Sequence, residues 1–161
     1  MRTIIETAKR LKAGLTTTTP SDQQGWSHHL DAPTARNENP TMDDFAAIFK
    51  ALRLLYAKHA DACVLLADDA DRYILGTHEV RQRDGYRTWL GGVEIKKSYV
   101  SAHLMPLYIH PDLIETMTPD LRRRMQGKAC LNFKRIDPNL FAQLDALIDL
   151  GIARFRADGR L

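Results

Sequence analysis

The chain has 161 residues, of which 44% are hydrophobic and 27% are charged, and its formal net charge at pH 7 is +3. This length suits one domain with its own core, and the composition is that of a globular chain and excludes wholesale disorder. The sequence has no apolar run long enough to span a membrane and no apolar segment of a secretory signal at its N-terminus, so we expect a soluble, cytoplasmic protein without a membrane partner. The mild charge also argues against nucleic acid as a partner.

The first 41 residues are expected to form an arm that precedes the domain. Apolar residues recur at helical spacing over residues 3–13, which predicts a short amphipathic helix. Residues 16–41 are rich in turn-forming residues, a composition typical of a linker or of an arm that lies on a surface. Trp26 is an isolated aromatic residue there, and we expect it to pin the arm by packing. The single domain is therefore predicted to span residues 42–161.

Two later segments have the apolar spacing of long amphipathic helices. The first follows Thr41, which can cap a helix, and we expect it to end near Ala60. Its apolar positions are Phe45, Ile48, Phe49, Leu52, Leu55 and Tyr56. The second begins with the helix-start pair Asp137-Pro138. Its apolar positions are Leu140, Phe141, Leu144, Leu147, Ile148, Ile152 and Phe155. Both stripes need a shared surface to bury them, and a sheet would provide it.

Short runs of strand-forming residues lie between these helices. The predicted strands cover residues 62–67, 72–77, 86–96, 99–108 and 129–134. Proline also starts two short helices after residues 110 and 118, and the second is expected to run to Gln126 and to end at Gly127. Consecutive antiparallel strands with helices at either end predict an α+β fold. We expect a two-layer sandwich, in which helices pack mainly on one face of an antiparallel sheet of about five strands.

The third predicted strand has two features of its own. Alternation places Trp89 on one face together with Gly91, Val93 and Ile95, and it places Glu94 and Lys96 on the opposite face. The pair Gly91-Gly92 inside a strand indicates a bulge or a close approach of two backbones.

The uncovered face of such a sheet supplies the first candidate site. Tyr99, Ser101 and His103 share one side of the fourth strand, while Asn132 and Lys134 share one side of the fifth. These side chains form either an ordinary solvated face or a ligand-binding surface. His103 is either a structural histidine or the titrating group of a site, and it is the best candidate for such a group in the chain.

Cationic residues concentrate in the segment from Leu121 to Lys128 and on the strand that follows. Arg124, Gln126, Lys128 and Lys134, with Asn132 beside them, could hold a carboxylate or a phosphate. In the other interpretation, the arginines only complement the negative end of a helix dipole. The two cysteines, Cys63 and Cys130, lie in apolar stretches, and we expect reduced core thiols.

Three segments resemble the YdhG-like family of small bacterial proteins, most of which have no assigned function. They are Tyr99-Val-Ser-Ala-His-Leu-Met-Pro-Leu-Tyr108, Pro111-Asp-Leu113 and Arg124-Met-Gln-Gly-Lys-Ala-Cys-Leu-Asn-Phe133. The resemblance covers roughly residues 43–156 and implies an α+β sandwich. Some relatives are grouped with frataxin-type iron chaperones, which would imply iron delivery through an acidic patch. In this chain the acidic residues are dispersed, and only Asp68, Asp69 and Asp71 come close to the cluster of oxygen ligands that a hard cation needs.

Our leading prediction is a non-catalytic binding or accessory protein that presents the sheet face and the basic corner to a small anionic ligand or a protein partner. One alternative is a small enzyme that uses His103 as acid or base, and a third is a frataxin-like iron-binding chaperone. We expect no cofactor and no metal site. A buried cleft around His103 would favour the enzyme, whereas an open face would favour the binding protein.

Overall fold

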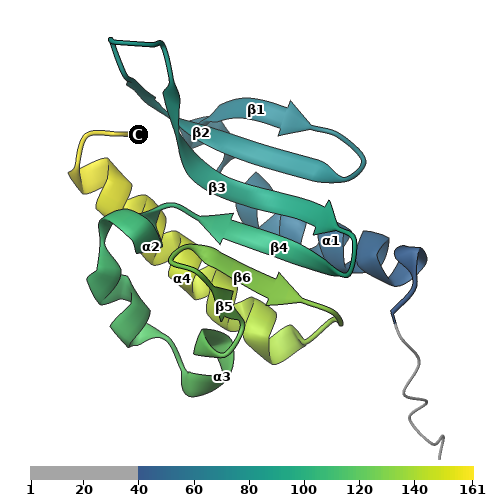
Figure 1. Ribbon diagram of the computed structural model, residues 1–161. Helices are drawn as coiled ribbons and strands as arrows, with labels where there is room; N and C mark the ends of the chain where they lie inside the picture. Colours follow the sequence, from purple (N-terminus) through teal and green to yellow (C-terminus); the bar gives the residue numbers. More distant parts are fainter. Residues whose placement is uncertain (1–39) are drawn as a thin grey trace, which may run out of the picture. The chain divides into compact units, whose positions relative to one another are not determined.

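The computed structural model describes residues 40–161, which form a six-stranded antiparallel sheet with helices (Figure 1). The expected arm helix and Trp26 lie outside the described residues. The strands are β1 (Val64–Asp68), β2 (Arg72–Val80), β3 (Arg87–Lys96), β4 (Tyr99–Leu104), β5 (Met125–Gln126) and β6 (Cys130–Phe133). The α-helices are α1 (Met42–Ala57), α2 (Pro106–Ile109), α3 (Pro119–Arg122) and α4 (Pro138–Ala157), and the 3-10 helices are η1 (Ala60–Ala62) and η2 (Pro111–Thr116). The strand order is β1-β2-β3-β4-β6-β5.

The two long helices, α1 and α4, lie on the same face of the sheet, which confirms the predicted α+β sandwich (Figure 1). Their apolar stripes are buried together, and Leu52, Leu144 and Phe155 are fully shielded from solvent. Val100, Ala102 and Leu104 of β4 and Leu131 and Phe133 of β6 point into this layer from the sheet. In the described part of the chain, no helix has the length and apolar character needed to cross a membrane.

Helix α1 begins at the predicted cap. The backbone N–H of Thr41 donates to the Asp44 carboxylate over 2.7 Å, and the N–H of Asp44 donates back to the Thr41 hydroxyl over 3.3 Å. This reciprocal capping box satisfies two of the N–H groups that every helix start leaves without a partner. The helix ends at Ala57, and the 3-10 turn η1 follows it, so the predicted end near Ala60 is close to the observed one.

A bulge in β3 makes one face assignment wrong. Leu75 of β2 pairs with Gly91, but its neighbour Gly76 pairs with Trp89, so Leu90 is an extra residue in β3. Leu90 is fully buried in the core, and the alternation of β3 reverses there. Trp89 consequently lies on the same face as Glu94 and Lys96, not opposite to them.

Close backbone approach explains the Gly91-Gly92 pair, as predicted. A Cβ atom on Gly91 would lie 2.3 Å from the carbonyl oxygen of His103, and one on Gly92 would lie 2.1 Å from that of Tyr73. Only glycine allows β3 to lie this close to both neighbouring strands.

The segment after β4 also departs from expectation. The predicted strand to Tyr108 ends at Leu104, because Pro106 cannot donate to a strand ladder and instead starts α2. The helix predicted to run from Pro119 to Gln126 ends at Arg122, and Met125–Gln126 form the short strand β5. Gly127 has a φ of 69° and serves the turn between β5 and β6, not a helix end. The sheet therefore has six strands, where about five were expected.

Candidate functional site

A pocket of about 280 Å³ lies on the sheet face opposite α1 and α4, and we refer to it as the open-face pocket. Among the helices that the structure describes, none crosses this face of the sheet (Figure 1). The pocket is lined by Trp89, Glu94, Lys96, Tyr99, Ser101, His103, Gln126, Cys130 and Asn132. It thus contains four of the predicted site residues: Tyr99, Ser101, His103 and Asn132.

Strand register brings these side chains together. Ser101 of β4 pairs with Glu94 of β3 on one side and with Asn132 of β6 on the other. Two residues further along β4, His103 pairs with Gly92 of β3 and with Cys130 of β6. Side chains of paired residues share a face, so two rows of functional groups cross the middle of the sheet. Gly92 has no side chain, and the side chain of β3 that meets the His103 ring is Trp89.

The His103 ring is held by contacts on several sides. Its Nδ1 atom lies 3.2 Å from the Sγ atom of Cys130, within hydrogen-bond range for sulfur. The Trp89 ring meets it edge to face, with ring centroids 6.1 Å apart. Behind the sheet, the hydroxyl of buried Tyr56 donates to the backbone carbonyl of His103 over 3.0 Å. The imidazole is therefore positioned by the Cys130 thiol and the Trp89 ring, while Tyr56 fixes the backbone behind it.

Burial sets the charge of His103. Removal from solvent lowers the pKa of His103 below its ordinary value of 6.5, and the nearby Glu94 carboxylate opposes this shift. Because Lys96 lies only 2.7 Å from Glu94, that carboxylate is already paired. His103 is therefore neutral at pH 7, and a neutral imidazole can accept a proton or a hydrogen bond.

Asn132 leaves hydrogen-bonding capacity in the pocket. Its side-chain nitrogen donates to the side-chain oxygen of Gln126 on β5. Its side-chain oxygen is buried and has no hydrogen-bond partner among residues 40–161. A buried polar atom without a partner costs about 1–3 kcal/mol, so a donor placed in the pocket would be favoured there. Ser101, only 8% exposed, adds a hydroxyl beside it.

The predicted basic corner is spread over three places. Lys128 lies in the turn between β5 and β6, with its ammonium nitrogen 5.2 Å from the centre of the Tyr108 ring. Lys134 is exposed and directly follows the other end of β6. Arg124 lies in a separate groove beside α3. Lys128 and Lys134 therefore flank β6 from its two ends, whereas the Arg124 side chain belongs to a different hollow.

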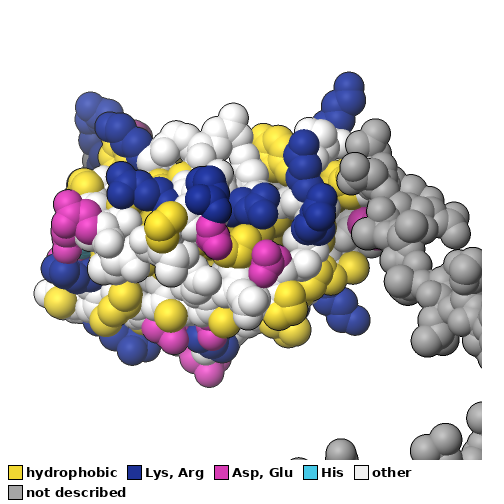
Figure 2. All heavy atoms as spheres, turned by 90° about the horizontal axis from the view of Figure 1, so that it is seen from below, with side chains coloured by type: hydrophobic (Ala, Val, Ile, Leu, Met, Phe, Trp, Pro, Cys, Tyr) yellow, Lys and Arg dark blue, Asp and Glu magenta, His cyan; other side chains and the backbone are white. Residues whose placement is uncertain are grey.

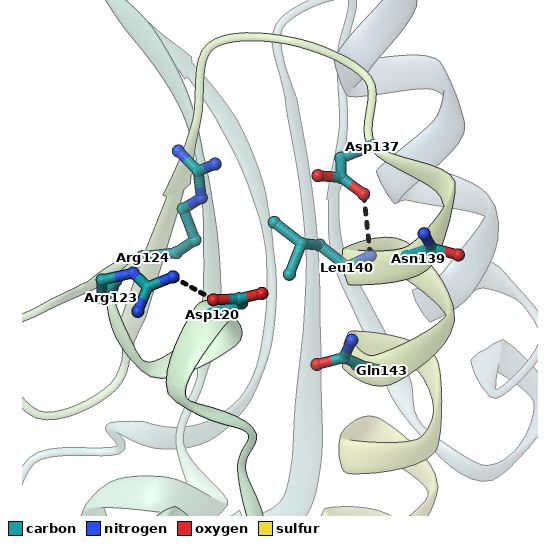
Figure 3. Close-up of a pocket in the computed structure, with 7 residues that line it drawn as sticks. All are labelled: Asp120, Arg123, Arg124, Asp137, Asn139, Leu140 and Gln143. Atoms are coloured by element: carbon teal, nitrogen blue, oxygen red, sulfur yellow. Dashed lines mark hydrogen bonds and ion pairs between the residues drawn. The ribbon is translucent and has the colours of Figure 1, made fainter.

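That groove lies between α3 and the start of α4 and has a volume of about 460 Å³ (Figure 3). Its residues are Asp120, Arg123, Arg124, Asp137, Asn139, Leu140 and Gln143. Arg123 is paired with Asp120, and Asp137 caps α4 by accepting from the N–H of Leu140 over 3.1 Å. Figure 2 shows a band of Lys and Arg side chains at this end of the molecule, with acidic side chains beside it. Two arginines and two aspartates give the groove no net charge, which makes it a poor anion site.

Sequence reasoning missed several pocket residues, above all Cys130. It was expected in the core, but it is partly exposed and lines the open-face pocket. Its place in the alternation with Asn132 and Lys134 could have revealed this, because residues two apart on a strand share a face. Trp89 was assigned to the other face because of the bulge. Gln126 was named for the basic corner as the last residue of a helix, but it lies in the short strand β5 and lines the open-face pocket.

Two of the three acidic residues named for iron, Asp68 and Asp69, form ion pairs with arginines. Arg53 binds Asp68 with two nitrogens, the shortest contact being 2.7 Å, and Arg72 pairs with Asp69 at 3.3 Å. Within residues 40–161, histidine, cysteine and acidic side chains form no group of three or more that could hold a metal ion. Comparison of the chain with protein-family models, curated proteins and solved structures yields no significant match. The resemblance to the YdhG-like family stays a prediction.

Proposed function

We propose that this protein binds a small polar molecule carrying an anionic group, and that the open-face pocket holds it. The observation that carries the proposal is the convergence of Ser101, His103 and Asn132 on one uncovered pocket. Together they offer hydroxyl, imidazole and amide groups, the few well-placed polar contacts that small-molecule sites use to orient a ligand. The position of this pocket on an uncovered face favours a binding protein over an enzyme with a buried cleft.

The charges around the pocket favour an anionic ligand. Within the lining, Lys96 and Glu94 are paired and cancel, so the excess positive charge comes from Lys128 and Lys134, which flank β6 at its two ends. Each charge-assisted hydrogen bond contributes about 1.5–3 kcal/mol, and a micromolar dissociation constant corresponds to about 8 kcal/mol. A few such contacts therefore support micromolar binding, in keeping with a shallow site.

Titration of the full chain with citrate, followed by backbone amide chemical shifts, tests the proposal. We expect saturable shifts in residues 99–103 and 130–134, because these segments carry the pocket side chains. Asn132→Ala should weaken the binding about tenfold or more, since it removes the polar side chain in the middle of the pocket. Arg122→Ala, an exposed change on α3, is the matched control and should leave binding intact.

Two results would contradict the proposal. Saturable shifts confined to residues 120–124 and 139–143 would place the ligand in the groove beside α3. Diffuse shifts that do not saturate and are equal in Asn132→Ala would mean that the open face is an ordinary solvated surface.

A further inference from the structure

The two cysteines of the chain lie in contrasting surroundings. Cys130 lines the open-face pocket, and its Sγ atom lies 3.2 Å from Nδ1 of His103. Cys63 lies between η1 and β1 and packs against the core, where burial raises its pKa to about 11 although Arg156 acts in the opposite direction. One thiol thus has a base and an opening to solvent, whereas the other is held protonated.

We propose that Cys130, with His103 as its base, forms mixed disulfides with small anionic disulfides that enter the open-face pocket. The proposal rests on the proposed function, from which it takes both the pocket and the anionic charge of the ligand. It adds a covalent step that ligand binding alone does not require.

The step is a thiol–disulfide exchange. Nδ1 of His103 takes the proton from Sγ of Cys130, and the resulting thiolate attacks one sulfur of the incoming disulfide. The ligand's S–S bond breaks as a new S–S bond forms to Cys130. The departing half leaves as a thiolate and takes the proton back from His103, so Cys130 is oxidised and the released thiol is the reduced product. No other oxidant is needed.

Geometry supports His103 as the base. With its proton on Nε2, the neutral ring presents the lone pair of Nδ1 to the thiol. The Trp89 contact holds the ring, and the hydrogen bond from Tyr56 fixes the backbone of His103 behind it. The thiolate is the reactive form of cysteine, so a neighbouring base raises reactivity at a pH where an isolated thiol stays protonated. The titratable groups that face this pair are Glu94 and Lys96 of β3 and Tyr99 of β4, which line the same pocket, and Tyr56 of α1 behind the sheet.

Oxidised glutathione, a disulfide with several carboxylates, is a direct probe. The full chain is incubated with it at pH 7, and each cysteine is followed by peptide mass spectrometry. We expect the mixed disulfide on Cys130 first. In His103→Gln, the rate at Cys130 should fall about tenfold or more, because the base is gone. Cys63 is the internal control: its rate should stay low in both proteins, and a rise in the variant would report loosening of the fold.

The pH profile of the unmodified protein gives a second measurement that does not depend on a variant. At a pH below its pKa, an unassisted thiol reacts about tenfold faster for each unit by which the pH is raised, because the thiolate fraction rises by that factor. Cys130 should instead keep a nearly constant rate from pH 6.5 to 8, while Cys63 climbs steeply. A steep climb for Cys130, or an unchanged Cys130 rate in a folded His103→Gln, would overturn the inference.

The citrate titration keeps the two proposals separable, because citrate contains no sulfur. Saturable citrate binding without a mixed disulfide would overturn the thiol chemistry alone. A mixed disulfide at Cys130 without citrate binding would instead overturn the proposed anion site.

Discussion

Tyr56 connects the core to the candidate site through a single hydrogen bond. Its side chain is fully buried against Gly91, where only glycine leaves room, and its hydroxyl reaches the carbonyl of His103. Burial raises the pKa of Tyr56 far above its ordinary value of 10, so the hydroxyl remains a donor at every pH at which the protein is studied. The backbone at His103 is therefore fixed from behind the sheet, while its imidazole lines the pocket on the open face.

Tyr56→Phe should lower the free energy of unfolding by about 0.5–1.5 kcal/mol, the usual contribution of one hydrogen bond, without disturbing the packing of the ring. Urea denaturation measures the loss. Tyr108→Phe is the matched control, because Tyr108 is 55% exposed, and it should change stability by less than about 0.5 kcal/mol. Equal losses in the two variants would show that the buried hydroxyl contributes nothing specific.

At the scale of elements, the strength of the periodic signal decides what the sequence could predict. Helices α1 and α4 were predicted well, because each repeats its apolar spacing over many residues and begins at a clear cap. Strand β5 has two residues, which is too short for any alternation, and the arginines before it favour a helix. The bulge at Leu90 could not be predicted either. The extra residue moves the preceding side chains of β3 to the opposite face of the sheet, and only the pairing with β2 reveals it.

The stripe of α1 provides an element-scale test. Phe49 is 6% exposed, and Phe49→Ala should cost about 3–5 kcal/mol, because it removes a buried ring and leaves a cavity between the helix and the sheet. Leu54→Ala on the same helix is the control: Leu54 is 60% exposed, so the cost should stay below about 0.5 kcal/mol. Chemical denaturation of both variants gives the comparison, and a loss under about 1 kcal/mol for Phe49→Ala would refute this packing.

The capping box of α1 makes a prediction about acid stability. Hydrogen bonds from the backbone N–H and the hydroxyl of Thr41 lower the pKa of Asp44 below its ordinary value of 3.8. The carboxylate therefore stabilises the folded state above pH 3.8, and this contribution is lost as the pH falls through the lowered value. We expect Asp44→Asn to reduce the urea midpoint at pH 6, with the gap to the unmodified protein closing towards pH 2. A gap of equal size at pH 6 and at pH 2 would contradict this role of the Asp44 carboxylate.

At the scale of the whole molecule, the site depends on contacts between distant parts of the chain. Alternation along β4 correctly grouped Tyr99, Ser101 and His103, which all line the open-face pocket. The pairing of His103 with Cys130 joins residues 27 positions apart, and no local pattern encodes that register. Lys128 and Arg124 are close in sequence, but the extended strand β5 lies between them, so they flank opposite ends of that strand.

The core that supports this site lies between elements of residues 40–161, and this leads to a prediction about truncation. The buried side chains of α1, α4 and the sheet contact one another, and Leu52, Val100 and Leu144 have no exposed surface. A chain that begins at Pro40 keeps the Thr41 cap and should retain the far-ultraviolet circular dichroism of a folded α+β domain, with one cooperative unfolding transition. The matched control begins at Lys58 and removes α1. It should not fold, because it uncovers the sheet beneath Leu52 and Tyr56. A shorter chain from Pro40 that is itself unfolded would show that the first 39 residues belong to the core.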